Sequence, residues 1–139
     1  MLPRTAREML KTAPLTVAAA TPLLEVQHLL VLAHVSGMPV IDDGGRVVGV
    51  LSASDVLRAL DQALDDDHDD RELEDRFALV AKLTALDIAT PDAIWVAPDT
   101  PVAQIAERMR SEGVHRVLVG NGERLDGVLT AFDMLAAVT

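Results

Sequence analysis

The stretch that decides the fold is RVVGVLSASD at residues 46–55, which returns as RLDGVLTAFD at residues 124–133. Each copy indicates a strand centred on Gly-Val-Leu, followed by a hydroxyl residue and, three positions later, an aspartate. An internal repeat is considered before any other signal, because missing it leads to the wrong fold. Since there are only two copies, we expect no solenoid. The repeat predicts two half-domains packed about a pseudo-twofold axis, with clefts between the halves.

The repeat extends upstream of this stretch and covers most of the chain. Thr21-Pro22 corresponds to Thr100-Pro101 at an offset of 79 residues, and the offset falls to 78 after a turn. The change arises because DDGG at residues 42–45 is matched by the shorter NGE at residues 121–123. A turn of this composition between two apolar runs predicts a β-hairpin in each half.

Each half is predicted to form a short helix, a strand, a helix, two strands and a final helix, which makes the fold class α+β. In the first half these elements are expected at residues 5 to about 11, 15–17, 22 to about 35, 38–41, 46–51 and 52 to about 64. In the second half they are expected at residues 84–88, 94–96, from 100 onward, 116–119, 125–129 and from 130 onward.

Capping signals and hydrophobic patterning support the helices. Thr5 and Glu8 have the spacing of a capping box. Thr21 and Thr100 each precede a proline, which predicts an N-cap followed by proline at the first helical position. The helix at residues 22–35 is apolar on more than one face. That pattern predicts packing against its own core and against a second surface.

The repeat divides the chain into a first domain at residues 1–62, an acidic linker with a partial helix at residues 63–82 and a second domain at residues 83–139. The linker contains DDDHDD at residues 65–70. Carboxylates suit Mg²⁺ or Ca²⁺, but this run lacks the glycine and the spaced ligands of a dedicated calcium loop. We interpret it as a solvated loop, and no metal site is predicted.

Composition limits the class of protein. Half of the 139 residues are apolar and only three are aromatic, which predicts an aliphatic core. The net charge of −10 argues against a nucleic-acid partner, because phosphate backbones need clustered Lys and Arg. Without cysteine there is no disulfide and no thiolate metal site. Since there is neither a signal peptide nor a membrane-spanning apolar run, we expect a cytoplasmic protein without a membrane partner.

The hydroxyl-x-x-aspartate elements, Ser52 with Asp55 and Thr130 with Asp133, allow two interpretations. The structural one is a variant of the capping box at a helix start, which needs no ligand. The functional one uses the same groups for binding. A helix N-terminus favours an anion, and a carboxylate can accept two hydrogen bonds from a ribose diol. The motif alone leaves both interpretations open.

His115-Arg116 is a second candidate for binding. The pair enters a strand of the second half, where the first half has Ser36-Gly37. An ordinary surface arginine beside a hydrogen-bonded histidine is the alternative. Because Thr130 and Asp133 belong to the same half, we favour a phosphate clamp made by the two basic side chains.

Taken together, these residues resemble a tandem pair of CBS domains, also called a Bateman module. The resemblance covers about residues 6–138. No single stretch is specific, but their order, spacing and duplication are. The matching stretches are VSGMPVID at residues 35–42, GGRVVGVLSASD at 44–55, GVHRV at 113–117 and GVLTAFD at 127–133.

The resemblance implies a three-stranded sheet with two helices in each half, and clefts that bind AMP, ADP, ATP, S-adenosylmethionine or NAD in many relatives. By the same resemblance Asp133 would hold a ribose, with Thr130, His115 and Arg116 on a phosphate. Ser52 and Asp55 would have these roles in the other cleft. The residues implied around the adenine are Thr16, Gly37, Met38, Pro39, Ile94 and Trp95.

The sequence also departs from the family pattern. Ser36-Gly37 replaces the basic pair in the first half, Leu118 stands where the first half has Pro39, and Phe132 lies inside the second hydroxyl-x-x-aspartate element, where it could crowd or stack on a ligand. One occupied site is therefore expected in preference to two.

An enzyme is the least favoured class, because no nucleophile with a base and an orienting partner is apparent. His28 and His34 lie in the apolar helix and are interpreted as packing residues. The favoured function is a regulatory module that binds an adenosine nucleotide and signals to an unidentified effector protein, as a homodimer. No cofactor is required, although a bound polyphosphate would bring Mg²⁺. The alternatives are a ligand-free dimerisation scaffold, or a module for S-adenosylmethionine or NAD.

Overall fold

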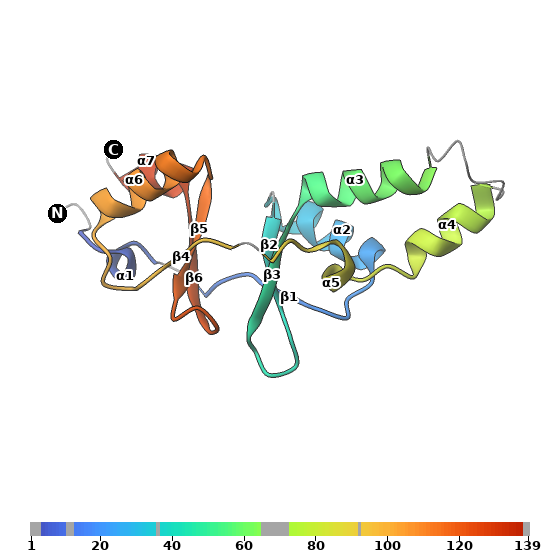
Figure 1. Ribbon diagram of the computed structural model, residues 1–139, viewed down its shortest axis with the longest axis horizontal. Helices are drawn as coiled ribbons and strands as arrows, with labels where there is room; N and C mark the ends of the chain where they lie inside the picture. The colour runs from blue at the N-terminus through green and yellow to red at the C-terminus, as the bar shows by residue number, and fades with distance from the viewer. Residues whose placement is uncertain (1–3, 11–12, 36, 65–72, 92, 138–139) are drawn as a thin grey trace. The chain divides into compact units, whose positions relative to one another are not determined.

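The computed structural model describes residues 4–10, 13–35, 37–64, 73–91 and 93–137. The acidic run at residues 65–70 lies outside these segments. The chain forms two compact units (Figure 1). Unit 1 comprises Met1–Pro14 and Ala93–Thr139, and unit 2 comprises Leu15–Asp92.

The described residues of unit 2 form a three-stranded sheet and four helices. Its elements are β1 (Val17–Ala18), α2 (Leu23–Ala33), β2 (Gly37–Ile41), β3 (Val47–Ser52), α3 (Ala53–Leu64), α4 (Leu73–Ala81) and α5 (Ala85–Ile88). The strand order is β1-β2-β3, with β1 parallel to β2 and β2 antiparallel to β3. Figure 1 shows its helices on one side of the sheet.

Unit 1 repeats this arrangement, with three helices in the part of it that the structure describes. Its elements are α1 (Ala6–Met9), β4 (Trp95–Val96), α6 (Val102–Glu112), β5 (Arg116–Gly120), β6 (Leu125–Thr130) and α7 (Ala131–Ala137). The strand order is β4-β5-β6, with the same parallel and antiparallel pairings. The α+β class and the order of elements in both halves are therefore confirmed.

The two copies of the sequence repeat exchange their short first helices. Helix α1 from the first copy belongs to unit 1, and helix α5 from the second copy belongs to unit 2. Helix α1 joins unit 1 through a hydrogen bond from Ala6 N to Thr100 O at 2.9 Å. Helix α5 joins unit 2 through Ala85 N, which donates to Thr21 O at 2.8 Å. The sequence division into residues 1–62, 63–82 and 83–139 follows the repeat, whereas the compact units follow these contacts.

Two predicted helix starts were wrong in detail. Pro22 and Pro101 are themselves N-caps, with extended ψ angles of 146° and 141°, and each helix begins one residue later. The carbonyl of each proline accepts the first hydrogen bonds of its helix, while the backbone of the proline itself is not helical, as is typical of an N-cap. At Thr5 the capping box does not form, because the Glu8 side chain accepts a hydrogen bond from Arg4 N at 2.9 Å instead.

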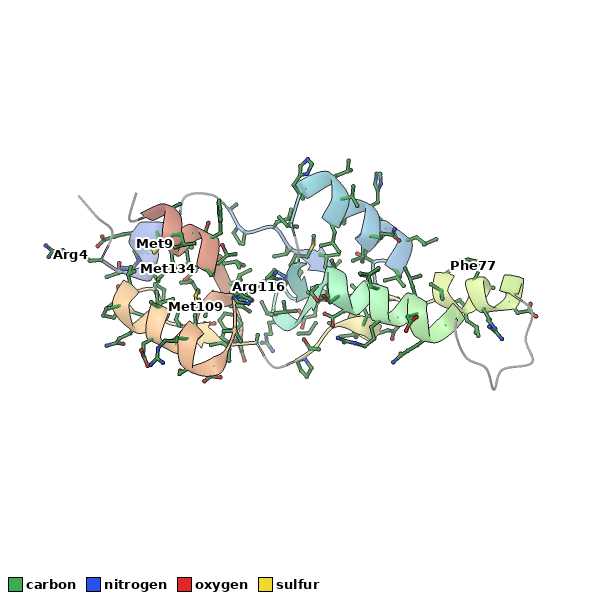
Figure 2. All side chains as sticks on the ribbon, turned by 90° about the horizontal axis from the view of Figure 1, so that it is seen from above. Arg4, Met9, Phe77, Met109, Arg116 and Met134 are labelled. Carbon is green, nitrogen blue, oxygen red and sulfur yellow. The ribbon has the colours of Figure 1, made fainter. Side chains whose placement is uncertain are left out.

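The cores are aliphatic, as the composition predicts. Unit 1 places Met9, Met109 and Met134 between α1, α6 and α7, where Figure 2 shows them close together. Flexible thioether side chains fill such irregular spaces well. The core of unit 2 is formed by the buried residues Val17, Leu23, Val26, Leu30, Met38, Val40, Leu51, Val56, Val80 and Ala85.

Both hairpins turn as the composition of their loops predicts. Oδ1 of Asp42 accepts hydrogen bonds from Gly44 N and Arg46 N, each at 2.9 Å. Oδ1 of Asn121 accepts equivalent bonds from Glu123 N and Arg124 N at 3.0 and 2.7 Å. These side chains close the turn by binding backbone N–H groups a few residues on, which fixes the register of the strands.

Membrane insertion has no support in the helices that the structure describes, since none of them is long and apolar enough to cross a bilayer.

Candidate functional site

Two candidate residues of unit 1, Arg116 and Thr130, lie on the face of its sheet that is turned away from the methionine core. Val117 and Val119 point into that core. Because side chains alternate along a strand, Arg116 lies on the opposite face. Arg116 is paired with Thr130 in the register of β5 and β6, so both residues share that face at the same end of the sheet.

Thr130 and Asp133 form a reciprocal pair at the start of α7. Thr130 N donates to Oδ2 of Asp133 at 2.8 Å, and Asp133 N donates to the Thr130 hydroxyl at 3.2 Å. No hydrogen bond to Oδ1 of Asp133 occurs within the segments that the structure describes. The pair therefore caps the helix and still presents one carboxylate oxygen.

His115 directly precedes β5, and Arg116 is the first residue of that strand. The carbonyl of His115 accepts a hydrogen bond from Ala131 N at 2.7 Å, which ties the start of β5 to the start of α7. The His115 side chain is exposed. Arg116 begins β5, where Figure 2 shows it at the margin of unit 1. The backbone of His115 is thus tied to the start of α7, close to Thr130 and Asp133, and Arg116 lies in register with Thr130.

The backbone N–H groups at the start of α7 are largely occupied. Those of Thr130, Ala131 and Asp133 have internal acceptors. An anion at this site would therefore be held mainly by the side chains of His115 and Arg116, because few free amides are available to it.

Unit 2 has a matching arrangement. Gly37 is paired with Ser52 in the register of β2 and β3, on the face opposite the core residue Met38. Ser52 N and the Ser52 hydroxyl donate to Oδ2 of Asp55 at 2.8 and 3.0 Å. Arg58 Nη1 donates to Oδ1 of the same carboxylate at 3.2 Å. Both oxygens of Asp55 are therefore engaged.

The residues expected around an adenine are less uniform. Thr16 directly precedes β1 and Pro39 lies on the same face of the sheet as Gly37. The Met38 side chain belongs to the core of unit 2. In this segment a ligand would meet the main chain of Gly37 more readily than the Met38 side chain.

Ile94 and Trp95 are also separated by the alternation of the strand. Ile94 packs against the core of unit 1, and its carbonyl accepts a hydrogen bond from Leu118 N at 2.8 Å. The Trp95 ring covers Gly120, at the hairpin end of β5. Since Arg116 begins the other end of β5, the ring lies away from the basic pair.

The histidines of α2 were interpreted wrongly. His28 and His34 are both exposed, because the helix turns its opposite face to the core. His34 is the C-cap of α2 and adopts a left-handed backbone.

Arg58 escaped the sequence analysis, although its spacing from Asp55 is a recognisable signal, since residues three apart on a helix are neighbours. A third hydroxyl-x-x-aspartate element also formed a capping box. At α5, Thr84 N and the Thr84 hydroxyl donate to Oδ2 of Asp87 at 2.8 and 3.1 Å. The motif thus caps a helix wherever it occurs, and its surroundings decide whether it can also bind a ligand.

In the described residues no three side chains of His, Cys, Asp or Glu gather closely enough to hold an ion.

Sequence comparison identifies the repeat. The family model described as the CBS domain matches residues 6–62 and 85–139. The A-adding tRNA nucleotidyltransferase of Geobacter sulfurreducens is 30% identical over 132 residues, which are 95% of this chain and 13% of that enzyme. This chain spans between 13% and 27% of the length of that enzyme and two further curated relatives.

Structural comparison finds CBS domain proteins with ligands. The CBS domain protein from Pyrobaculum aerophilum complexed with AMP is 30% identical, with a TM-score of 0.72, and the match covers 93% of this chain and 88% of that one. CBSX2 in complex with AMP is 27% identical, with a TM-score of 0.75, covering 98% of this chain and 96% of that one.

Proposed function

This chain belongs to the CBS domain family and carries two copies of the domain, and on that premise we propose that it is a regulatory module for an adenosine nucleotide of the AMP, ADP or ATP class. The nucleotide binds at the unit 1 site and shifts the balance between two states of the module. An effector protein responds to that shift.

The presented oxygen of Asp133 is the observation that carries this proposal. A ribose diol needs two acceptor sites on a carboxylate, and Oδ1 of Asp133 has no partner among the described residues. The diol would use this oxygen together with the second lone pair of Oδ2.

Arg116 and His115 supply the second half of the recognition. Arg116 shares the sheet face of Thr130, in direct register with it. A guanidinium is a planar donor that matches a phosphate with two parallel hydrogen bonds. In a chain of net charge −10 the phosphate binds where these basic groups offset the general repulsion.

The relatives support the ligand class. Two similar CBS domain structures hold AMP. ATP or ADP would occupy the same ribose and phosphate groups and would bring Mg²⁺ with them. S-adenosylmethionine and NAD remain alternatives for the same carboxylate, because each of them carries an adenosine ribose.

A thermal-shift panel of AMP, ADP, ATP, NAD and S-adenosylmethionine tests the proposal. A ligand at a hundred times its Kd stabilises the fold by about 2.7 kcal/mol, which raises the Tm by several degrees in a chain of this size. Asp133→Ala should abolish the shift. Asp126→Ala, an exposed carboxylate on β6, is the matched control and should retain it.

Two results would count against nucleotide sensing. One is a flat panel that calorimetry at millimolar ligand also finds flat. The other is a shift that survives Asp133→Ala unchanged.

A dimerisation scaffold is the second candidate, and a specific observation favours it. Helix α2 buries Leu23, Val26 and Leu30 but leaves an apolar stripe exposed on its other side. The stripe consists of Leu24, Val31 and Leu32, with exposed fractions of 59%, 65% and 63%. We propose that a second copy of this chain covers it, so that the module is a homodimer.

The two candidates are compatible, because a dimer can also bind nucleotide. They differ at His115 and Arg116, which a scaffold without a ligand does not need.

A further inference from the structure

The carboxylate of Asp55 in unit 2 already has a partner at each oxygen. Oδ2 accepts from Ser52 N and the Ser52 hydroxyl, and Oδ1 accepts from Arg58 Nη1 at 3.2 Å. The Asp55 side chain is 11% exposed, whereas that of Arg58 is 63% exposed. The guanidinium therefore covers the carboxylate from the solvent side.

The corresponding carboxylate of unit 1 lacks this cover. Since Asp55 corresponds to Asp133 in the repeat, Arg58 corresponds to Ala136. An alanine cannot donate to the carboxylate, and within the described chain Oδ1 of Asp133 accepts no hydrogen bond. The two halves share the capping pair and differ in the residue one turn later.

We propose that Arg58 acts as an internal competitor for the ribose, so that unit 2 is the weak site of the module and unit 1 the strong one. This inference rests on the proposed function, because it assumes that the aspartate of each hydroxyl-x-x-aspartate element receives the ribose diol. Arg58 is thus a specificity-determining residue: it decides which half takes the ligand.

The physical reason is competition for the same lone pairs. A diol needs both carboxylate oxygens, and Arg58 holds Oδ1 with a charge-assisted bond. An exposed pair of this kind changes an equilibrium constant by up to about fivefold. The partial burial of Asp55 raises that factor, because hydrogen bonds to charged groups are stronger away from water.

The absence of a basic pair adds to the difference. Unit 1 offers His115 and Arg116 at the start of β5, whereas the aligned segment of unit 2 has Ser36-Gly37. Removing Arg58 should therefore improve ribose binding in unit 2 without making it equal to unit 1.

Calorimetric titration of the full chain with AMP tests the inference. We expect the wild type to bind one equivalent strongly. Arg58→Ala should lower the Kd of the second equivalent by about fivefold or more and leave the first unchanged. Ala136→Arg, which gives unit 1 the same arginine, should raise the Kd of the first equivalent by a similar factor.

A matched control separates this effect from the loss of any surface charge. Arg110 on α6 pairs with Glu107 at the same three-residue spacing and is 74% exposed. Arg110→Ala should leave both equivalents unchanged. Because Arg58 and residue 136 are exposed, both variants should fold, and a thermal melt of each without ligand verifies that.

The analogue 2′,3′-dideoxy-AMP identifies the group involved, because it lacks both ribose hydroxyls. The gain in Arg58→Ala should disappear with this analogue. A gain that persists would mean that Arg58 acts on the phosphate or by general charge, which overturns the inference.

Failure of the inference is distinguishable from failure of the proposed function. Wild-type binding of AMP with no change in Arg58→Ala, or weaker binding in that variant, overturns the inference and leaves the proposed function standing. Two equal equivalents in the wild type also overturn it. No binding by any variant overturns both.

Discussion

At the level of single residues, the two halves end their second helix in the same left-handed conformation with different amino acids. Gly113 closes α6 at φ 65° and ψ 34°. His34 closes α2 at φ 54° and ψ 39°, and it is the one non-glycine residue with positive φ in the described chain. A side chain with a Cβ is strained there by about 1–2 kcal/mol, whereas glycine is the usual residue at this cap.

His34→Gly should therefore stabilise unit 2. We expect a gain of about 1 kcal/mol or slightly less, since glycine loses more backbone entropy on folding. Urea unfolding followed by circular dichroism measures it. Gly113→His is the reciprocal variant and should destabilise by a similar amount. A loss of stability in His34→Gly would show that the His34 side chain makes a stabilising contact that outweighs the strain.

The basic pair supplies a second prediction at this scale. Arg116→Ala should weaken the binding of AMP by about tenfold or more, because a charge-assisted phosphate contact contributes about 1.5–3 kcal/mol. Binding of adenosine, which has no phosphate, should change little. Calorimetric titration of both ligands decides this, and an equal loss for both would remove Arg116 from the phosphate.

At the level of elements, Gly49 in the sheet of unit 2 and Gly127 in the sheet of unit 1 let a neighbouring segment approach the strand. A Cβ on Gly49 of β3 would lie 2.9 Å from Thr90 O. That carbonyl is held in place, since Val50 and Thr90 exchange two backbone hydrogen bonds of 2.9 Å each. A Cβ on Gly127 of β6 would instead collide with the side chain of Leu10.

The two glycines should respond differently to alanine. Gly49→Ala should destabilise the protein by about 1–3 kcal/mol, because the obstacle is a fixed backbone atom. Gly127→Ala should cost less, since the Leu10 side chain can change rotamer. Chemical unfolding of the two variants side by side measures the difference. The opposite ranking would mean that the segment around Thr90 yields more easily than Leu10.

At the level of the whole molecule, the repeat has diverged on the outer faces of α2 and α6. Val31 and Leu32 correspond to Arg110 and Ser111. Helix α6 carries ion pairs there, Arg110 with Glu107 and Arg108 with Glu112, so its outer face suits water. The stripe on the outer face of α2 contains no charged side chain. Two copies of the chain, each with a net charge of −10, could therefore pair through this stripe without placing like charges in contact there.

Leu32→Glu should separate a dimer into monomers without unfolding the chain, because it introduces a charge into the stripe at a position that is 63% exposed in one copy. Sedimentation velocity gives the oligomeric state. Ser111→Glu is the matched control on α6 and should remain dimeric. A wild type that sediments as a monomer, or a Leu32→Glu variant that remains dimeric, would rule out the α2 stripe as the interface.

The sequence predicted most elements because their signals are local. The hairpin turns, the strands around Gly49 and Gly127 and the hydroxyl-x-x-aspartate helix starts each depend on residues a few positions apart. The predicted starts of α2 and α6 were early by one residue. A proline suits both the N-cap and the first helical position, so the sequence does not decide which of the two positions Pro22 and Pro101 occupy.

The duplicated sequence by itself determined the α+β fold, the two halves and the pairs Thr130–Asp133 and Ser52–Asp55. Only the tertiary structure decided three further points: that α1 and α5 join the units they do, that Arg116 shares a sheet face with Thr130, and that Arg58 covers Asp55. The physical reason is that strand register and the packing of distant segments depend on contacts between residues far apart in the chain. Arg58 lies close to Asp55 in sequence, but whether its long side chain turns to the carboxylate or to the solvent is settled by the folded surroundings.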